Sequence, residues 1–130
     1  QMHYVARWIT PLGSPRRFDA RFFIARIPSN QIPQHDDSEL VNSAWLTPHE
    51  ILERIDREEM ILMTVTERMI RSLALFESAS QVIEAAAKNL PDQRARVDSK
   101  TGKITMPGEP GYDDGLIDVE SGWVRLRPAP

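Results

Sequence analysis

Two groups of polar residues in the first third of the sequence could do chemistry, and the first group is basic. Arg17 and Arg21 stand four residues apart, and strand alternation would put both on one face with Asp19 between them. Neighbouring guanidinium groups suit an anionic ligand such as a phosphate, because each donates charge-assisted hydrogen bonds. The two arginines could equally pair with Asp19 or with the loop that follows, so both roles stay open.

The second group is acidic and follows a proline-containing stretch. His35, Asp36, Asp37 and Glu39 form the only dense cluster of potential metal ligands or general bases in the sequence. Residues 28–38 contain two prolines and several polar side chains, so the same four residues could be solvated turn formers. Their chemistry therefore depends on where this loop folds.

Three strand-like runs would have to position these groups. The first is 2–10, the second is 16–27, and the third is 39–46. In the second run, one face should lie in the core, and the other should be charged at its start and buried at its end. The core face would comprise Phe18, Ala20, Phe22 and Ile24, and the buried end would comprise Phe23, Ala25 and Ile27.

Helices and a β-rich tail should follow. The sequence Thr47 to Glu50 is a capping box with a proline at the first helical position, and Thr64 to Glu67 resembles a second one. A third helix should open near Ser78. Beyond residue 91 we expect a hairpin with its turn at 98–102 and a last hairpin that pairs 116–119 with 123–126. Trp8 and Trp45 should both anchor the core.

Composition limits the possible functions. The 130 residues fit one domain, and 41% hydrophobic with 27% charged residues is ordinary for a soluble globular protein. A net charge of −3 gives no general attraction to nucleic acid. The absence of cysteine excludes disulfides and cysteine metal sites. No apolar run could span a bilayer, so we expect no membrane partner and a cytoplasmic location.

Several of these segments together resemble the second half of a Nudix hydrolase, in particular the larger members that act on coenzyme A and related diphosphates. The matching pieces are Trp8-Ile9-Thr10-Pro11, then Arg16 to Phe23, then Glu39 to Pro48, and the Pro-Gly-rich segment Pro107 to Tyr112. The resemblance implies a magnesium-dependent diphosphatase as the parent protein. It also implies that Arg17 and Arg21 contact phosphate, that Phe23 lines the substrate pocket, and that Glu39 or Asp37 is a candidate catalytic base.

The chain departs from this family in one decisive respect. The Nudix box, a helix whose glutamates lie one turn apart and hold Mg²⁺, is absent. The only local imitation is Asp56 to Met60, which lacks a second carboxylate pair and a closing glycine. We therefore assign no metal ligands to this chain and expect it to be inactive alone.

We therefore expect an α+β fold that corresponds to the C-terminal portion of a Nudix-like mixed sheet. Strands should occupy 1–48, helices 48–90, and a hairpin and loop tail 91–130, within a single domain or domain fragment. The expected ligand is a nucleoside-diphosphate-linked molecule such as coenzyme A or an acyl-CoA. The alternative is a noncatalytic binding or assembly module that has lost the metal-binding helix. Missing strands would leave an open sheet edge, so we expect self-association or a separate N-terminal segment.

Overall fold

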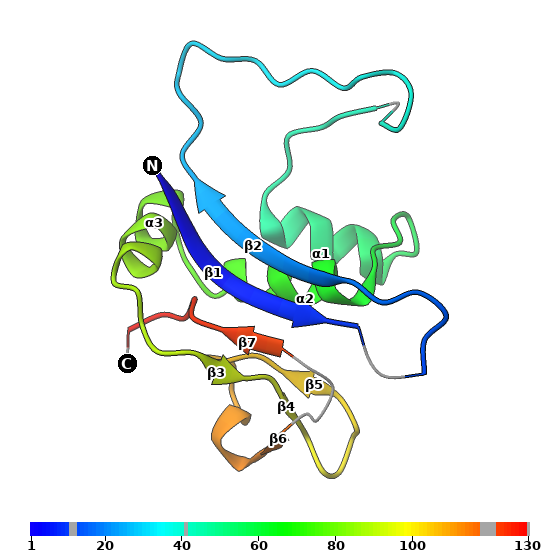
Figure 1. Cartoon of the computed structure of the whole chain (residues 1–130), viewed down its shortest axis with the longest axis vertical. Helices are drawn as coiled ribbons and strands as arrows, with labels where there is room; N and C mark the ends of the chain where they lie inside the picture. Colours follow the sequence, from blue (N-terminus) through cyan, green and yellow to red (C-terminus); the bar gives the residue numbers. More distant parts are fainter. Residues whose placement is uncertain (11–12, 41, 118–121, 130) are drawn as a thin grey trace.

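A four-stranded sheet with three helices on one of its faces organises the chain (Figure 1). The computed structural model describes residues 1–10, 13–40, 42–117 and 122–129. The strand order is β2-β1-β7-β3, and all three described pairings are antiparallel. The strands are β1 (Met2–Ile9), β2 (Asp19–Ala25), β7 (Gly122–Val124) and β3 (Gln93–Arg94). The α+β class is confirmed, whereas the expected mixed sheet is antiparallel in its described pairs.

A second, three-stranded sheet has the order β5-β4-β6. Its strands are β4 (Arg96–Val97), β5 (Ile104–Thr105) and β6 (Leu116–Ile117). The predicted hairpin around 98–102 is confirmed, because β4 pairs with β5. The predicted last hairpin is wrong in its pairing: β6 adds to β4, while β7 inserts between β1 and β3 in the other sheet. Residues 118–121 of that hairpin lie outside the described residues.

The helices begin close to the predicted positions. They are α1 (Pro48–Asp56), α2 (Thr64–Leu73) and α3 (Ala79–Ala87), with a short 3₁₀ helix η1 (Tyr112–Asp114). The capping box at α1 is confirmed, because the Thr47 side chain accepts from the Glu50 N–H and the Glu50 carboxylate accepts from the Thr47 N–H. The predicted box at α2 is wrong, since Met63 is the N-cap and no side chain caps that end.

The core lies between the large sheet and the helices. Trp8 is 3% exposed, and its indole N–H donates to the Met69 sulfur at 3.3 Å. Gly122 pairs with Trp8, and the absence of a side chain there leaves room for the indole ring. The other buried hydrophobic residues of this cluster are Val5, Ala6, Val82, Ala85, Ala86, Ala95, Met106, Val124 and Leu126. The predicted core role of Trp8 is confirmed.

The segment between β2 and α1 forms an arch that projects from the molecule (Figure 1). We use this name for residues 26–40 and 42–46. The predicted strand 39–46 is wrong, because no described residue of the arch is in a strand. Its Asp36 carboxylate accepts from the Ser38 and Leu40 N–H groups, which folds the chain into a turn instead of an extended run.

Burial along β2 differs from the prediction at both ends. Phe22 and Ile24 pack against the core as expected. Phe18 is 61% exposed, and the supposedly buried end is open, with Phe23 51% and Ile27 48% exposed. The reason is that β2 is an edge strand and the helices cover only one face of the sheet (Figure 1). Within the described residues, no helix has the length and apolar character needed to cross a bilayer.

Candidate functional site: an apolar pocket beneath the arch

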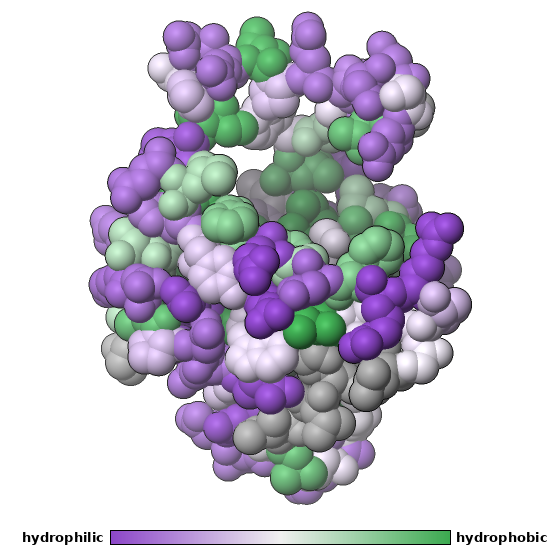
Figure 2. Space-filling model, in the orientation of Figure 1, coloured by the Kyte–Doolittle hydropathy of each residue, from purple (hydrophilic) through white to green (hydrophobic). Residues whose placement is uncertain are grey.

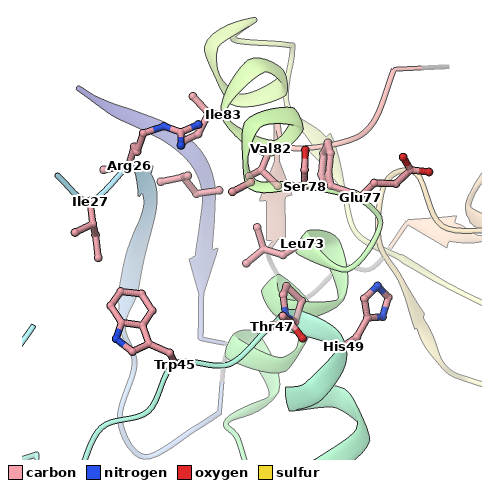
Figure 3. A pocket seen from close by; sticks show the side chains of 15 residues that line it. Arg26, Ile27, Trp45, Thr47, His49, Leu73, Glu77, Ser78, Val82 and Ile83 are labelled. Carbon is pink, nitrogen blue, oxygen red and sulfur yellow. The ribbon is translucent and has the colours of Figure 1, made fainter. Parts of the chain in front are cut away.

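A pocket of about 580 Å³ lies where the end of β2, the arch and the helices meet (Figure 3). Figure 2 shows an opening between the arch and the rest of the molecule, with hydrophobic side chains visible behind it. A cavity of this size and apolar character is typical of small-molecule sites. The apolar side chains that line it are Ile24, Ala25, Ile27, Trp45, Pro48, Leu73, Phe76, Ala79, Val82 and Ile83.

The polar side chains at this pocket come from the arch, from α1 and from the start of α3; they are Arg26, Thr47, His49, Glu77 and Ser78. Arg26 follows β2, and its guanidinium donates to the Ser80 hydroxyl at 3.2 Å. Ser78 caps α3, because its hydroxyl accepts from the Gln81 N–H. Arg26 forms no ion pair with a described carboxylate. The pocket thus combines an apolar interior with a polar edge that carries Arg26 and the Glu77 carboxylate, which suits a ligand with an apolar body and a polar end.

Trp45 is a pocket residue whose position differs from the one predicted. It was expected to anchor the core, but it is 75% exposed and stands on the arch side of the pocket (Figure 3). Trp45 lies two residues before the capping threonine Thr47, in a connecting segment that belongs to no strand. The closeness of Trp45 to the helix start was therefore the sequence signal that this ring would lie in a loop and not in the core.

The predicted substrate-binding residues do not gather in this pocket. Arg17 precedes β2 and donates to the Thr10 carbonyl at 3.2 Å. Arg21 and Phe23 are exposed on the opposite face of β2 from Ile24, where Phe23 meets Tyr4 edge to face with ring centroids 5.7 Å apart. Arg21 and Phe23 therefore share one surface, whereas the Arg17 guanidinium is bonded to the backbone just beyond the end of β1.

The predicted catalytic residues lie on the arch. Asp37 has a positive φ of 62° and accepts from the His35 ring, with 2.9 Å between the His35 Nε2 and a carboxylate oxygen. Glu39 is exposed. The backbone N–H of Leu40, followed by that of Ser38, lowers the pKa of Asp36, so this carboxyl stays ionised as a turn former. Among the described residues, no three His, Asp or Glu side chains are grouped so that they could hold a metal ion.

The described geometry therefore supports ligand binding in the apolar pocket. The His35 and Asp37 pair offers too few ligands for Mg²⁺, which requires near-octahedral oxygen coordination, so these residues do not fit the ion. No family model, no curated protein and no solved structure matches this chain.

Proposed function

We propose that this chain is the C-terminal, substrate-binding part of a Nudix-type pyrophosphohydrolase. Its substrate would be a nucleoside-diphosphate-linked molecule such as coenzyme A or an acyl-CoA. The observation that supports this proposal is the apolar pocket with Arg26 at its edge. Such a pocket would take the acyl or pantetheine end of the ligand, with Arg26 close to its polar part.

The lining residues explain why an acyl chain would be favoured. Each methylene group that leaves water for an apolar environment contributes about 0.8 kcal/mol. Two added methylenes therefore contribute roughly 1.6 kcal/mol, which is about a tenfold gain in affinity. Leu73, Phe76 and Val82 supply the apolar contacts from α2, α3 and their connection.

Metal chemistry is not assigned to the residues of this chain. In the proposed parent enzyme, the Mg²⁺ ligands would come from a Nudix box that is not among residues 1–130. The described residues would bind and orient the substrate, with Arg17, Arg21 and Phe23 still predicted to contact it and Asp37 and Glu39 as candidate bases.

A second function is favoured by one observation. The pocket is complete within the described residues, whereas those residues contain no group of metal ligands. A noncatalytic module that binds an acyl-linked ligand would need only the pocket. Purified chain that binds acyl-CoA, and whose full reading frame lacks a Nudix box, would establish this alternative.

The proposal is tested by an acyl-length series. Acetyl-, hexanoyl- and decanoyl-CoA are titrated into the purified chain while the fluorescence of Trp45 is followed, with Trp45→Phe identifying its signal. We expect affinity to rise with chain length and the Trp45 emission to shift to shorter wavelength as the ring loses water.

Two alanines of α3 provide matched variants. Ala79 lines the pocket at the start of the helix, and Ala87 is exposed at its end, outside the pocket. Ala79→Phe should fill the pocket and abolish the dependence on chain length, and Ala87→Phe should leave it intact. Equal affinity for all three acyl-CoA ligands in the unchanged chain would contradict the proposal.

A further inference from the structure

The outer face of the large sheet, opposite the helices, carries an ordered row of arginine and aromatic side chains. Strand register places Arg7 opposite both Arg21 and Trp123, and Trp123 opposite Arg94. The guanidinium carbons of Arg94 and Arg7 lie 4.6 Å and 5.8 Å from the Trp123 ring centroid. Four strands thus contribute one transverse row of three arginines and one tryptophan, in the order Arg21, Arg7, Trp123 and Arg94.

A second row runs beside the first. The guanidinium carbon of Arg125 lies 4.6 Å from the Tyr4 ring centroid, and Tyr4 meets Phe23 at an interplanar angle of 60°. Arg125 is connected to the sheet because its backbone N–H donates to the Val5 carbonyl. We call the two rows together the outer platform; its members are Tyr4, Arg7, Arg21, Phe23, Arg94, Trp123 and Arg125.

Both rows lie on one face because β1 contains a bulge. The register shifts between Tyr4 and Ala6, so Tyr4 faces Phe23 and Arg7 faces Arg21 although three positions separate Tyr4 from Arg7. Phe23 and Arg21 are two residues apart on β2 and therefore point to the same side. The extra residue in β1 makes the platform continuous.

The platform contains four arginines although the whole chain has a net charge of −3. Two of them are paired with described aspartates: Arg7 donates twice to Asp19, at 2.9 and 2.7 Å, and Arg125 donates to Asp92 at 2.8 Å. The hydrogen bond from Arg7 lowers the pKa of Asp19, which keeps that pair ionised. Arg21 forms no ion pair with a described carboxylate, so it is available to an anionic ligand. Figure 2 shows this face, with hydrophilic and pale residues across its middle.

We propose that the outer platform binds a nucleotide, with the base stacked on the aromatic and guanidinium groups and the phosphates near Arg21. Arginine and aromatic planes bind a base by stacking, and an arginine donates to phosphate oxygens in charge-assisted hydrogen bonds. One arginine available to the ligand suits the one or two phosphates of a single nucleotide. A nucleic-acid strand carries a phosphate on every nucleotide and needs a longer basic track.

This inference deepens the proposed function, and it rests on that function for the connection between the two halves of the ligand. The platform and the pocket meet at β2, where consecutive residues Phe23 and Ile24 lie on opposite faces. Because β2 has β1 as its only described partner in the sheet, its outer edge is open. A coenzyme A-like molecule would pass over this edge, with its nucleotide on the platform and its acyl end in the pocket.

The two halves are tested with separate probes. ADP is titrated into Trp45→Phe protein by calorimetry and by quenching of Trp fluorescence, and S-decanoyl-pantetheine, which has no nucleotide, is titrated into the unchanged protein. We expect ADP to bind and adenosine to bind roughly tenfold more weakly, because it lacks the phosphates. The double variant Arg21→Gln/Phe23→Ala removes one exposed cation and one exposed ring, and ADP should bind it roughly tenfold or more weakly.

The matched control is Arg57→Gln/Ile61→Ala, which also removes one exposed cation and one exposed apolar side chain, but near α1 and away from the platform. Its affinity for ADP should equal that of the parent. Loss of ADP binding in the control, or no ADP binding at all, overturns the inference. Tighter binding of an eight-nucleotide single strand than of ADP, with a salt dependence showing release of more than two ions, overturns it in favour of nucleic acid. If ADP binds and S-decanoyl-pantetheine does not, the proposed function is overturned, and nucleotide binding by the outer platform is retained.

Discussion

Replacing Gly122 with alanine should destabilise the fold through one close contact. A Cβ atom at this position would lie 2.3 Å from a carbon of the Trp8 ring and 2.5 and 2.6 Å from two others. These distances are far below van der Waals contact, so either the ring or the strand must move. Gly122 lies in β7 directly opposite Trp8 in β1, and that pairing holds the two backbones together.

Trp8 has little freedom to move. It is 3% exposed, its indole N–H is bonded to Met69, and the Arg68 guanidinium carbon lies 5.1 Å from its ring centroid. Adding a methyl group to a packed core costs about 1–3 kcal/mol, and here we expect the upper part of that range. For a domain of this size, each kcal/mol lowers Tm by roughly 4 °C.

The assay is urea and thermal unfolding of Gly122→Ala, Trp8→Phe and the double variant. The smaller phenyl ring should leave space for the new methyl group, so the double variant should lose less free energy of unfolding than the sum of the two single losses. A parental Tm for Gly122→Ala, or strictly additive losses, would refute this account of how β7 packs on β1.

We expect four further results, which concern catalysis, the phosphate contacts, the Asp98 carboxylate and the open edge of β2. The isolated chain should show no coenzyme A diphosphatase activity and no tight Mg²⁺ binding, and calorimetric detection of two tight ions together with turnover would contradict this. In the intact enzyme, Arg21→Ala should weaken substrate use by roughly 1.5–3 kcal/mol with little change in Tm. Arg17→Ala should weaken substrate use and also lower Tm, because the Arg17 side chain donates to the Thr10 carbonyl. Enzyme kinetics and thermal unfolding of both variants separate the two effects. The N–H groups of Lys100 and Thr101 lower the pKa of Asp98, so its stabilising effect is present above the unfolded pKa of about 4 and is lost as pH falls through the lower folded pKa. Asp98→Asn should therefore differ from the parent in urea midpoint at pH 7, and the difference should shrink as acid protonates Asp98 in the folded parent. The open edge of β2 should cause self-association or capture of a separate strand, and a monodisperse 14.8 kDa monomer by native mass measurement would show that the chain closes its own sheet edge.

Local signals in the sequence predicted the elements that local chemistry determines. Alternation located β1 and β2, and the Thr47 to Glu50 box located the start of α1, because these patterns act within a few residues. The predicted strand 39–46 was wrong because a strand forms only beside another strand that pairs with it. The local sequence does not show whether such a partner strand lies nearby in the fold. The last hairpin failed for a related reason, since β7 finds its partners in β1 and β3, distant in sequence.

The candidate site was less predictable than the fold. Alternation correctly placed Arg21 on the face opposite Phe22, but only the three-dimensional arrangement brings Trp123 and Arg94 into the same row. The pocket was missed because its walls come from three separate segments, which sequence spacing does not connect. Trp45 shows the limit most clearly, since large aromatic residues are usually buried and only the surrounding loop leaves this one exposed.

The bulge in β1 makes this strand tolerant of one particular change in length. Tyr4 and Arg7 are three positions apart, but they face Phe23 and Arg21, which are two positions apart. Deleting Val5 or Ala6 would give β1 the two-residue spacing of a regular strand, so Tyr4 would still face Phe23, at the cost of one buried side chain. A deletion between Arg7 and Ile9 has no extra residue to absorb it and would turn the preceding part of β1 to the other side of the sheet. Deep mutational scanning with single-codon deletions should therefore show weaker effects at residues 5 and 6 than at residue 8.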